Sequence, residues 1–134
     1  SPAGRQIQRR HAGARILLVE DEPINREVAL FMLEDVHIVV DLAEDGLQAL
    51  QMARETPYAL ILMDMQMPRM NGIESARRIR ADSLNRDSPI IAMTANAFAE
   101  DRKACLEAGM NDFLSKPVEP ERLLETILKW LSRI

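Results

Sequence analysis

Five polar side chains that could act together on a phosphoryl group each stand where a short apolar run of this sequence ends. They are a pair of acids at Glu20 and Asp21, a third acid at Asp64, a hydroxyl at Thr94 and an amine at Lys116. A carboxylate can attack phosphorus as a nucleophile, while an ammonium group and a hydroxyl can bind the oxygens of the transferred group. As a set they predict that Asp64 becomes an aspartyl phosphate.

The three acids need a positive partner if they lie close together. Two carboxylates about 4 Å apart repel each other by roughly 4 kcal/mol near a protein surface, and this repulsion favours protonation. Mg²⁺ or Mn²⁺ would relieve it, since both ions prefer oxygen ligands. Mg²⁺ commonly takes one or two carboxylates together with waters and phosphate oxygens. We therefore expect a cation site that binds best when a phosphoryl group is present.

Apolar runs and helical periodicities alternate along the chain. The runs predict five short strands, at residues 15–19, 37–42, 59–63, 89–93 and 112–115. Apolar residues at helical spacing predict five helices, which begin at Pro23, cover 46–55, 72–81 and 98–108, and begin again near Pro120. Wholly apolar strands are typical of a parallel sheet that is buried on both faces.

This alternation predicts an α/β fold, in which a single doubly wound (βα)5 domain surrounds a parallel sheet. Right-handed crossovers favour the strand order 2-1-3-4-5. The carboxyl ends of strands one, three, four and five then share one edge, where ligands bind in such sheets. Because Pro68 and the pair Asn71-Gly72 force a turn after Asp64, that acid faces a loop.

The composition is that of an ordinary globular domain. A chain of 134 residues can form one hydrophobic core, and it is 47% apolar and 28% charged. No apolar run approaches the roughly 20 residues of a membrane span, and the N-terminus lacks the apolar core of a signal peptide. The single cysteine, Cys105, agrees with a reducing compartment. We expect a cytoplasmic location.

Positive charge is concentrated at the N-terminus. Residues 1–15 hold four arginines and no acid, and without them the chain has 13 basic and 21 acidic residues, a net charge of about −8. This balance argues against nucleic-acid binding by the folded part. Residues 1–14 show no hydrophobic period, so we interpret them as a linker or a cloning remnant, with an interaction arm as the alternative. Residues 15–134 are the predicted domain.

Four segments closely resemble the receiver domain of bacterial two-component response regulators. They are VEDE at 19–22, MDMQMPRMNG at 63–72, MTANAF at 93–98 and DFLSKP at 112–117. The resemblance covers residues 15–134 with every core motif in order. It implies a flavodoxin-like fold and a signalling phosphoprotein that takes its phosphoryl group from a phosphohistidine in the presence of Mg²⁺.

The resemblance also implies a role for each site residue. The phosphoacceptor of the family matches Asp64, and its acidic pair matches Glu20 and Asp21. Asp21, Asp64 and the main-chain carbonyl of Gln66 are expected to bind the metal ion directly, whereas Glu20 acts through water. The invariant lysine of the family matches Lys116.

Thr94 and Phe113 match the pair of side chains that switch position on phosphorylation. The hydroxyl is expected to move inwards and the ring to enter the vacated space, which changes the surface of the fourth helix, fifth strand and fifth helix of the predicted domain. Phe113 replaces the tyrosine often found there and has no hydroxyl to bond. Gln66 and Asn96 match positions that tune the lifetime of the phosphoryl group.

The motifs are most similar to those of receivers fused to hybrid sensor histidine kinases. We therefore expect a histidine kinase or a histidine phosphotransfer domain as partner, and a parent that can be membrane-bound. The chain ends soon after its last helix without a DNA-binding segment, which fits a domain cut from such a kinase. A stand-alone single-domain regulator is the alternative. The isolated domain is expected to catalyse only its own phosphorylation and dephosphorylation.

Two other functions fit the residues less well. An Mg²⁺ phosphatase with an aspartyl nucleophile is expected to have a second aspartate two residues after the first, where this chain has Gln66, and a cap-domain insertion. A degenerate receiver that only binds partners would lack the acidic pair, the aspartate or the lysine. This sequence retains all of them.

Overall fold

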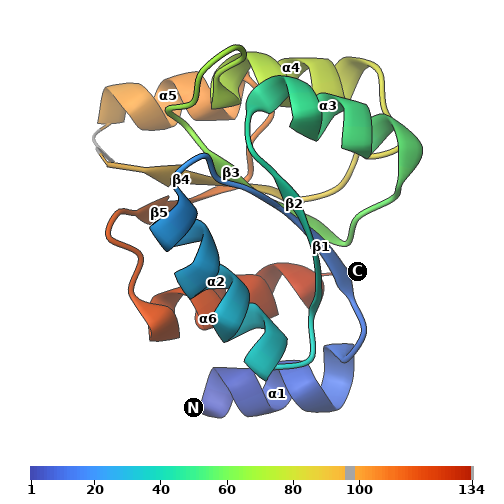
Figure 1. Cartoon of the computed structure of the whole chain (residues 1–134), viewed down its shortest axis with the longest axis vertical. Coiled ribbons are helices and arrows are strands. Elements are labelled where there is room, and N and C mark those ends of the chain that lie inside the picture. Colours follow the sequence, from blue (N-terminus) through green and yellow to red (C-terminus); the bar gives the residue numbers. More distant parts are fainter. Residues whose placement is uncertain (96–98, 134) are drawn as a thin grey trace.

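A parallel sheet of five strands lies between two layers of helices (Figure 1). The structure, a computed structural model, describes residues 1–95 and 99–133. The elements in chain order are α1 (Pro2–His11), β1 (Arg15–Val19), α2 (Pro23–Asp35), β2 (Val39–Ala43), α3 (Gly46–Glu55), β3 (Leu60–Asp64), α4 (Gly72–Ala81), β4 (Ile90–Thr94), α5 (Ala99–Glu107), β5 (Asp112–Ser115) and α6 (Pro120–Leu131). The strand order β2-β1-β3-β4-β5 and the parallel pairings confirm the predicted fold class. None of the described helices is long and apolar enough to cross a membrane.

Each face of the sheet has its own layer of helices and its own core. Helices α1, α2 and α6 cover one face, and α3, α4 and α5 cover the other (Figure 1). Alternate residues of the inner strands enter the two cores, so Leu18 and Leu62 belong to the first core and Leu17 and Ile61 to the second. Both β3 and β4 are buried along their whole length. This burial on two sides explains the unbroken apolar runs of the sequence.

The parallel register brings the ends of four strands to one edge of the sheet. Asp64, the last residue of β3, pairs with Met93, and Thr94 follows at the end of β4. Thr94 pairs with Ser115, the residue before Lys116. The acidic pair follows β1, which lies beside β3. The polar residues noted in the sequence therefore belong to the same edge.

The second strand begins two residues later than the sequence predicts. His37 has a left-handed backbone conformation with a φ of 66°, and its carbonyl accepts a hydrogen bond from the amide of Gly13 (2.9 Å). The turn after α2 therefore includes His37, and β2 runs over Val39–Ala43. The predicted helix at 98–108 corresponds to α5; Phe98 lies outside the described residues.

The first residues of the chain form a helix that the sequence pattern did not reveal. Ala3 and Ile7 of α1 join the core beneath α2 and α6, and Gln8 donates a hydrogen bond to the carbonyl of Asp35 at the end of α2 (2.9 Å). Two buried apolar residues are too few to give a recognisable period, so this helix depends on tertiary packing. The assignment of residues 1–14 to a linker stays a prediction, but α1 shares the core of the domain.

Candidate functional site

Asp64 is an almost fully buried carboxylate, and two groups hold it in place. The Nζ atom of Lys116 lies 2.8 Å from its Oδ1. The backbone amide of Gln66, an exposed residue of the following loop, donates a hydrogen bond to the same oxygen (3.2 Å). Burying a carboxylate is costly unless it is paired and hydrogen-bonded, and these two contacts satisfy both conditions.

Two more carboxylates lie beside Asp64. Side-chain oxygens of Glu20, Asp21 and Asp64 all lie within 4.8 Å of one another. Glu20 is buried, whereas Asp21 is exposed. The Nζ of Lys116 is also 3.6 Å from Glu20, so one ammonium group contacts two of the three acids. The cluster with its lysine is formally negative, and Asp21 opens it to solvent.

Crowding of the acids changes the protonation of Glu20. Burial raises the pKa of Glu20 to about 7, and Asp64 adds to the shift through a hydrogen bond and its charge. The ammonium group of Lys116 acts in the opposite direction. For Lys116, burial acts to lower the pKa, but Asp64 and Glu20 outweigh it and raise the pKa above the ordinary value. Near neutral pH, Lys116 is therefore charged while Glu20 is partly protonated.

The oxygens of this cluster fit a hard divalent cation. Three carboxylates offer oxygens within reach of a single ion, and oxygen is the ligand that Mg²⁺ and Mn²⁺ prefer. A cation would also favour the ionised form of Glu20, which burial and Asp64 disfavour. Both the spacing and the charge of the site therefore suit such an ion.

Thr94 and Phe113 occupy the last two strands. Thr94 is 7% exposed at the end of β4, and its carbonyl accepts a hydrogen bond from the amide of Lys116 (2.8 Å). Phe113 is half-buried against the core beneath α3, α4 and α5, and the guanidinium of Arg102 lies 4.9 Å from its ring centre. Asn96 lies outside the described residues. The switch and lifetime roles stay predictions.

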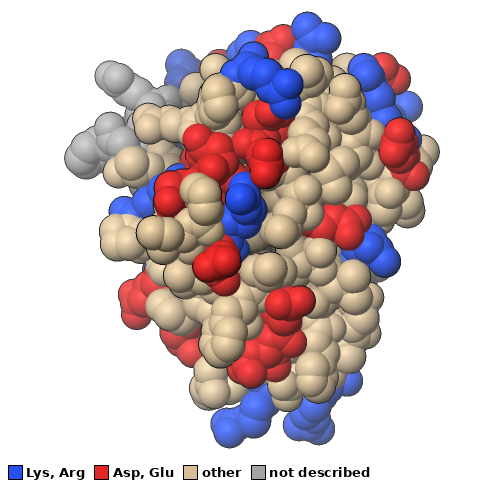
Figure 2. Space-filling view, in the orientation of Figure 1, with Lys and Arg blue, Asp and Glu red and all other residues tan. Residues whose placement is uncertain are grey.

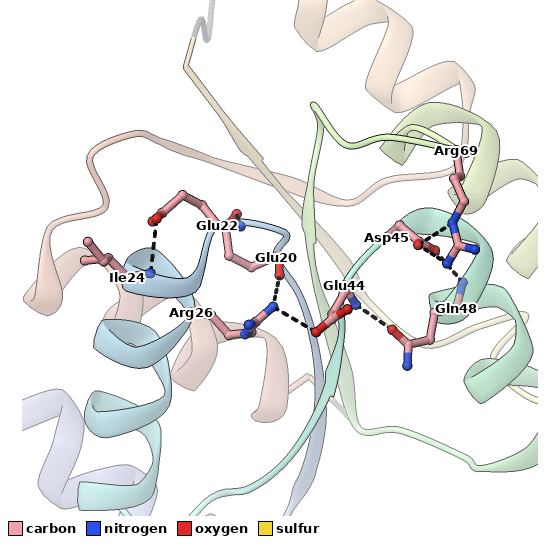
Figure 3. Close-up of polar contacts among 8 residues, drawn as sticks. All are labelled: Glu20, Glu22, Ile24, Arg26, Glu44, Asp45, Gln48 and Arg69. Carbon is pink, nitrogen blue, oxygen red and sulfur yellow. Dashed lines mark hydrogen bonds and ion pairs between the residues drawn. The ribbon is translucent and has the colours of Figure 1, made fainter.

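Four charged residues around the site were not identified from the sequence. Arg26 donates a hydrogen bond to the main-chain carbonyl of Glu20 (3.2 Å) and lies 3.6 Å from Glu44. Asp45 accepts hydrogen bonds from Nε (2.7 Å) and Nη2 of Arg69 (Figure 3). The position of Asp45 before a helical period could have identified it as an N-cap. No local signal connects it to Arg69, which is 24 residues away.

The molecular face that carries the site combines charged and apolar regions. Figure 2 shows Asp and Glu side chains gathered next to basic side chains near the middle of this face. Along α2, Ile24, Val28 and Phe31 are 70%, 52% and 74% exposed. A cavity of about 150 Å³ lies beside α2, with Glu20 and Lys116 among its lining residues. Most of the other residues that line this cavity are apolar, and exposed apolar side chains beside such a pocket are typical of an interaction site.

Fold and site together define a doubly wound α/β protein with a buried aspartate, an acidic pair and a lysine at the carboxyl edge of its sheet. The family model for the response regulator receiver domain matches residues 16–128. The chain therefore belongs to the receiver domain family.

Curated relatives include both very long and short proteins. The signal transduction histidine-protein kinase BarA of Escherichia coli (strain K12) is 40% identical over 115 residues, a match that covers 86% of this chain and 12% of that protein. An uncharacterized 14.6 kDa protein of Leptolyngbya boryana is 38% identical over 115 residues, covering 86% of this chain and 88% of that protein. The chain thus spans only a small part of the kinases it matches.

Solved receiver domains have the same fold. The receiver domain of sensor histidine kinase PA1611 from Pseudomonas aeruginosa PAO1, which has a magnesium ion in its active site cleft, is 45% identical with a TM-score of 0.83, covering 90% of this chain and 98% of that chain. The receiver domain of Ssk1 from Saccharomyces cerevisiae, crystallized with the histidine phosphotransfer protein Ypd1, is 32% identical with a TM-score of 0.82, covering 89% of each chain.

Proposed function

We propose that this chain is the phosphoacceptor of a two-component phosphorelay and that Asp64 receives a phosphoryl group from a phosphohistidine. The contact between the buried Asp64 carboxylate and Lys116, beside the acidic pair, is the observation that best supports the proposal. It combines a nucleophile, a cation site and a group that can bind phosphoryl oxygens.

Asp21, Asp64 and the main-chain carbonyl of Gln66 would hold Mg²⁺, or Mn²⁺ in its place, and Glu20 would act through water. The spacing of the three carboxylates supports this assignment, as does the magnesium ion in the PA1611 receiver. When bound, the ion supplies positive charge that offsets the repulsion between Asp64 and an incoming phosphoryl group. The amide of Gln66 holds one Asp64 oxygen at the same time.

The transfer makes one bond and breaks one. An oxygen of Asp64 bonds to phosphorus while the bond from phosphorus to the donor imidazole breaks. The electron pair of that bond returns to the ring, whose other nitrogen carries a proton, so the ring leaves as neutral imidazole. Lys116 and the hydroxyl of Thr94 then bind oxygens of the transferred group. Catalysis of this kind depends on positioning and charge stabilisation.

Phosphorylation then alters the surface formed by α5, β5 and α6. Thr94 moves towards the phosphoryl group, and the ring of Phe113 follows it into the space that is released. The position of Phe113 supports this role, because its ring packs on the core and also contacts the exposed Arg102. Gln66 and Asn96, two residues after Asp64 and Thr94, set the lifetime of the phosphoryl group.

The phosphoryl donor is a histidine phosphotransfer domain or a histidine kinase, which docks on α2. This helix begins at Pro23, two residues after Asp21. Its exposed residues Ile24, Val28 and Phe31 recur at helical spacing, so they form one apolar stripe. A donor that covers the stripe can bring its histidine to Asp64. The crystallized pair of Ssk1 and Ypd1 supports a partner of this kind. The proposal includes no contact with nucleic acid.

We infer that the parent is a hybrid sensor histidine kinase and that this domain lies in the cytoplasm. The similarity to BarA supports the inference. Kinase activity would then belong to other parts of the parent, because the domain itself supplies only the acceptor. The short relative from Leptolyngbya boryana supports the alternative, a stand-alone single-domain regulator.

Phosphoramidate tests the proposed function, because its phosphorus–nitrogen bond resembles that of phosphohistidine. With Mg²⁺, intact mass spectrometry is expected to show one added phosphate on the wild type and none on Asp64→Asn. Asp87→Asn, which changes an exposed acid in the loop before β4, serves as a control and is expected to react normally. Equal phosphorylation of Asp64→Asn would overturn the proposal. Sustained hydrolysis of an unrelated phosphomonoester would favour the phosphatase alternative.

A further inference from the structure

The loop between β3 and α4, residues 65–71, is fastened to the start of α3 by an ion pair. Arg69 has a left-handed backbone conformation with a φ of 66°. Its Nε and Nη2 atoms both donate to Oδ2 of Asp45, the first over 2.7 Å (Figure 3). When a guanidinium donates two hydrogen bonds to one carboxylate, both its distance from the carboxylate and its orientation are fixed.

Asp45 is itself a fixed anchor. It is 4% exposed, and its Oδ1 accepts a hydrogen bond from the amide of Gln48 (2.8 Å), which caps α3. Burial acts to raise the pKa of Asp45, but the Gln48 amide and Arg69 outweigh it and hold the pKa below its ordinary value. One carboxylate oxygen of Asp45 thus caps α3, and the other binds Arg69 of the loop.

Further contacts join the start of α3 to this loop and to α4. The amide of Gly46 donates to the carbonyl of Met70 (3.0 Å), and Ser75 Oγ donates to the carbonyl of Gly46 (2.9 Å). A Cβ atom at Gly46 would lie 2.0 Å from the Met70 carbonyl oxygen. The loop therefore approaches α3 as closely as a residue without a side chain permits.

Arg69 and Gln66 belong to the same short loop. Only Met67 and Pro68 separate them, the proline has a fixed φ, and its carbonyl accepts a hydrogen bond from the amide of Met70 (2.8 Å). Gln66 donates its amide to Asp64 and is the residue whose carbonyl we assign to the metal ion. We propose that Asp45 and Arg69 are positioning residues that hold the Gln66 peptide for cation binding. This inference rests on the proposed function.

A second arginine–aspartate contact between α3 and the end of α4 provides a matched control. Arg54 donates from Nε to the carbonyl of Asp82 (3.2 Å) and from Nη2 to its carboxylate (2.9 Å). This pair lies at the opposite ends of the two helices, and both of its side chains are exposed. If Arg69 only joined elements of the fold, loss of either arginine would have the same kind of effect.

The test uses Arg69→Asn, Asp45→Asn, the double variant and Arg54→Gln in the full chain. Asparagine tolerates a positive φ, so Arg69→Asn removes the guanidinium without adding backbone strain. Asparagine at position 45 keeps an N-cap oxygen and removes the charge. Isothermal titration with Mg²⁺ alone gives the dissociation constant, urea unfolding gives stability, and phosphoramidate gives the phosphorylation rate as a function of Mg²⁺ concentration.

Both single variants are expected to raise the Mg²⁺ dissociation constant about tenfold, as loss of an outer-sphere partner commonly does. The double variant should show little further change, because the two residues act as one unit. The rate at saturating Mg²⁺ should stay within about twofold of the wild type, and Arg54→Gln should bind Mg²⁺ normally.

Wild-type Mg²⁺ affinity in Arg69→Asn would overturn the inference, as would an equal loss of affinity in Arg54→Gln. If Arg69→Asn does not fold, Asp45→Asn alone decides between these results. A wild-type chain that neither binds Mg²⁺ nor accepts phosphate would instead refute the proposed function.

Discussion

The Nζ of Lys116 lies 2.8 Å from Oδ1 of Asp64, and Lys116 is thereby bound to the side chain that we propose as the phosphoacceptor. The same ammonium group lies 3.6 Å from Glu20. Lys116 therefore stabilises two buried carboxylates before any phosphoryl group arrives. On phosphorylation it can transfer its contact from the carboxylate to a phosphoryl oxygen, which also accepts charge-assisted hydrogen bonds.

Replacing this ammonium group is expected to separate cation binding from phosphorylation. Lys116→Met should slow phosphorylation by phosphoramidate about 100-fold, as loss of one charge-stabilising donor does in other enzymes. It should also tighten Mg²⁺ binding, because a positive charge beside Asp64 is removed. Lys129→Met, at an exposed lysine near Asp112, is the control and should change neither quantity. An unchanged phosphorylation rate in Lys116→Met would contradict the assigned role.

Stability without a divalent cation is expected to fall as the pH rises from about 4.5 to about 7. Burial raises the pKa of Glu20 from 4.5 to about 7 in the folded chain. The folded state therefore holds this proton more tightly than the unfolded state, and the resulting stability is lost as the carboxyl ionises. The loss amounts to about 1 to 3 kcal/mol. Saturating Mg²⁺ should remove most of it, because the ion favours the carboxylate.

Urea unfolding at pH 4.5 and pH 8, with and without Mg²⁺, measures this effect. Glu20→Gln has no carboxyl at that position, so subtracting its pH dependence isolates the contribution of Glu20. If Glu20→Gln loses as much stability as the wild type over this range, Glu20 does not have the raised pKa.

The apolar stripe of α2 is expected to affect transfer from a protein donor only. Phe31 is 74% exposed, so Phe31→Ala should leave folding and phosphorylation by phosphoramidate unchanged. Transfer from a phosphorylated histidine phosphotransfer domain that serves the wild type should slow at least tenfold, since exposed aromatic residues often dominate interface energies. Leu84→Ala, an exposed apolar residue in the loop after α4, is the control. Equal transfer to both variants would exclude this docking surface.

Helix α1 is expected to contribute to the stability of the domain. Ile7 is fully buried, so Ile7→Ala should lower the free energy of unfolding by about 2 to 4 kcal/mol. Gln6→Ala, at the neighbouring exposed position, should change it by less than about 0.5 kcal/mol. Urea unfolding compares the two. A negligible effect of Ile7→Ala would indicate that α1 is not attached to the core in solution.

Most of the fold could be predicted because its inner strands are buried on both faces. Residues 60–64 of β3 have no polar member before Asp64, so an apolar run and its terminal acid are both visible in the sequence. The parallel register then places Asp64 and Thr94 on neighbouring strand ends, and Lys116 follows the next strand. This part of the site is a direct consequence of sheet topology.

Other features depend on contacts that leave no local pattern. α1 is helical because Ala3 and Ile7 find a core formed by distant elements, and its sequence alone shows only dispersed arginines. Arg69 contacts Asp45 because the loops that follow β3 and β2 lie at the same edge of the sheet. His37 forms a turn at a position where apolar neighbours predict a strand. The role of Asn96 remains a prediction.

Locating the modified residue shows whether Asp64 is the phosphoacceptor. Borohydride reduces an aspartyl phosphate to homoserine, which peptide mass spectrometry can assign to one position. After treatment with phosphoramidate and Mg²⁺, we expect homoserine at Asp64, no homoserine at Asp21 and no reduced glutamate side chain at Glu20. A reduced side chain at another aspartate or glutamate, with Asp64 unmodified, would contradict this assignment.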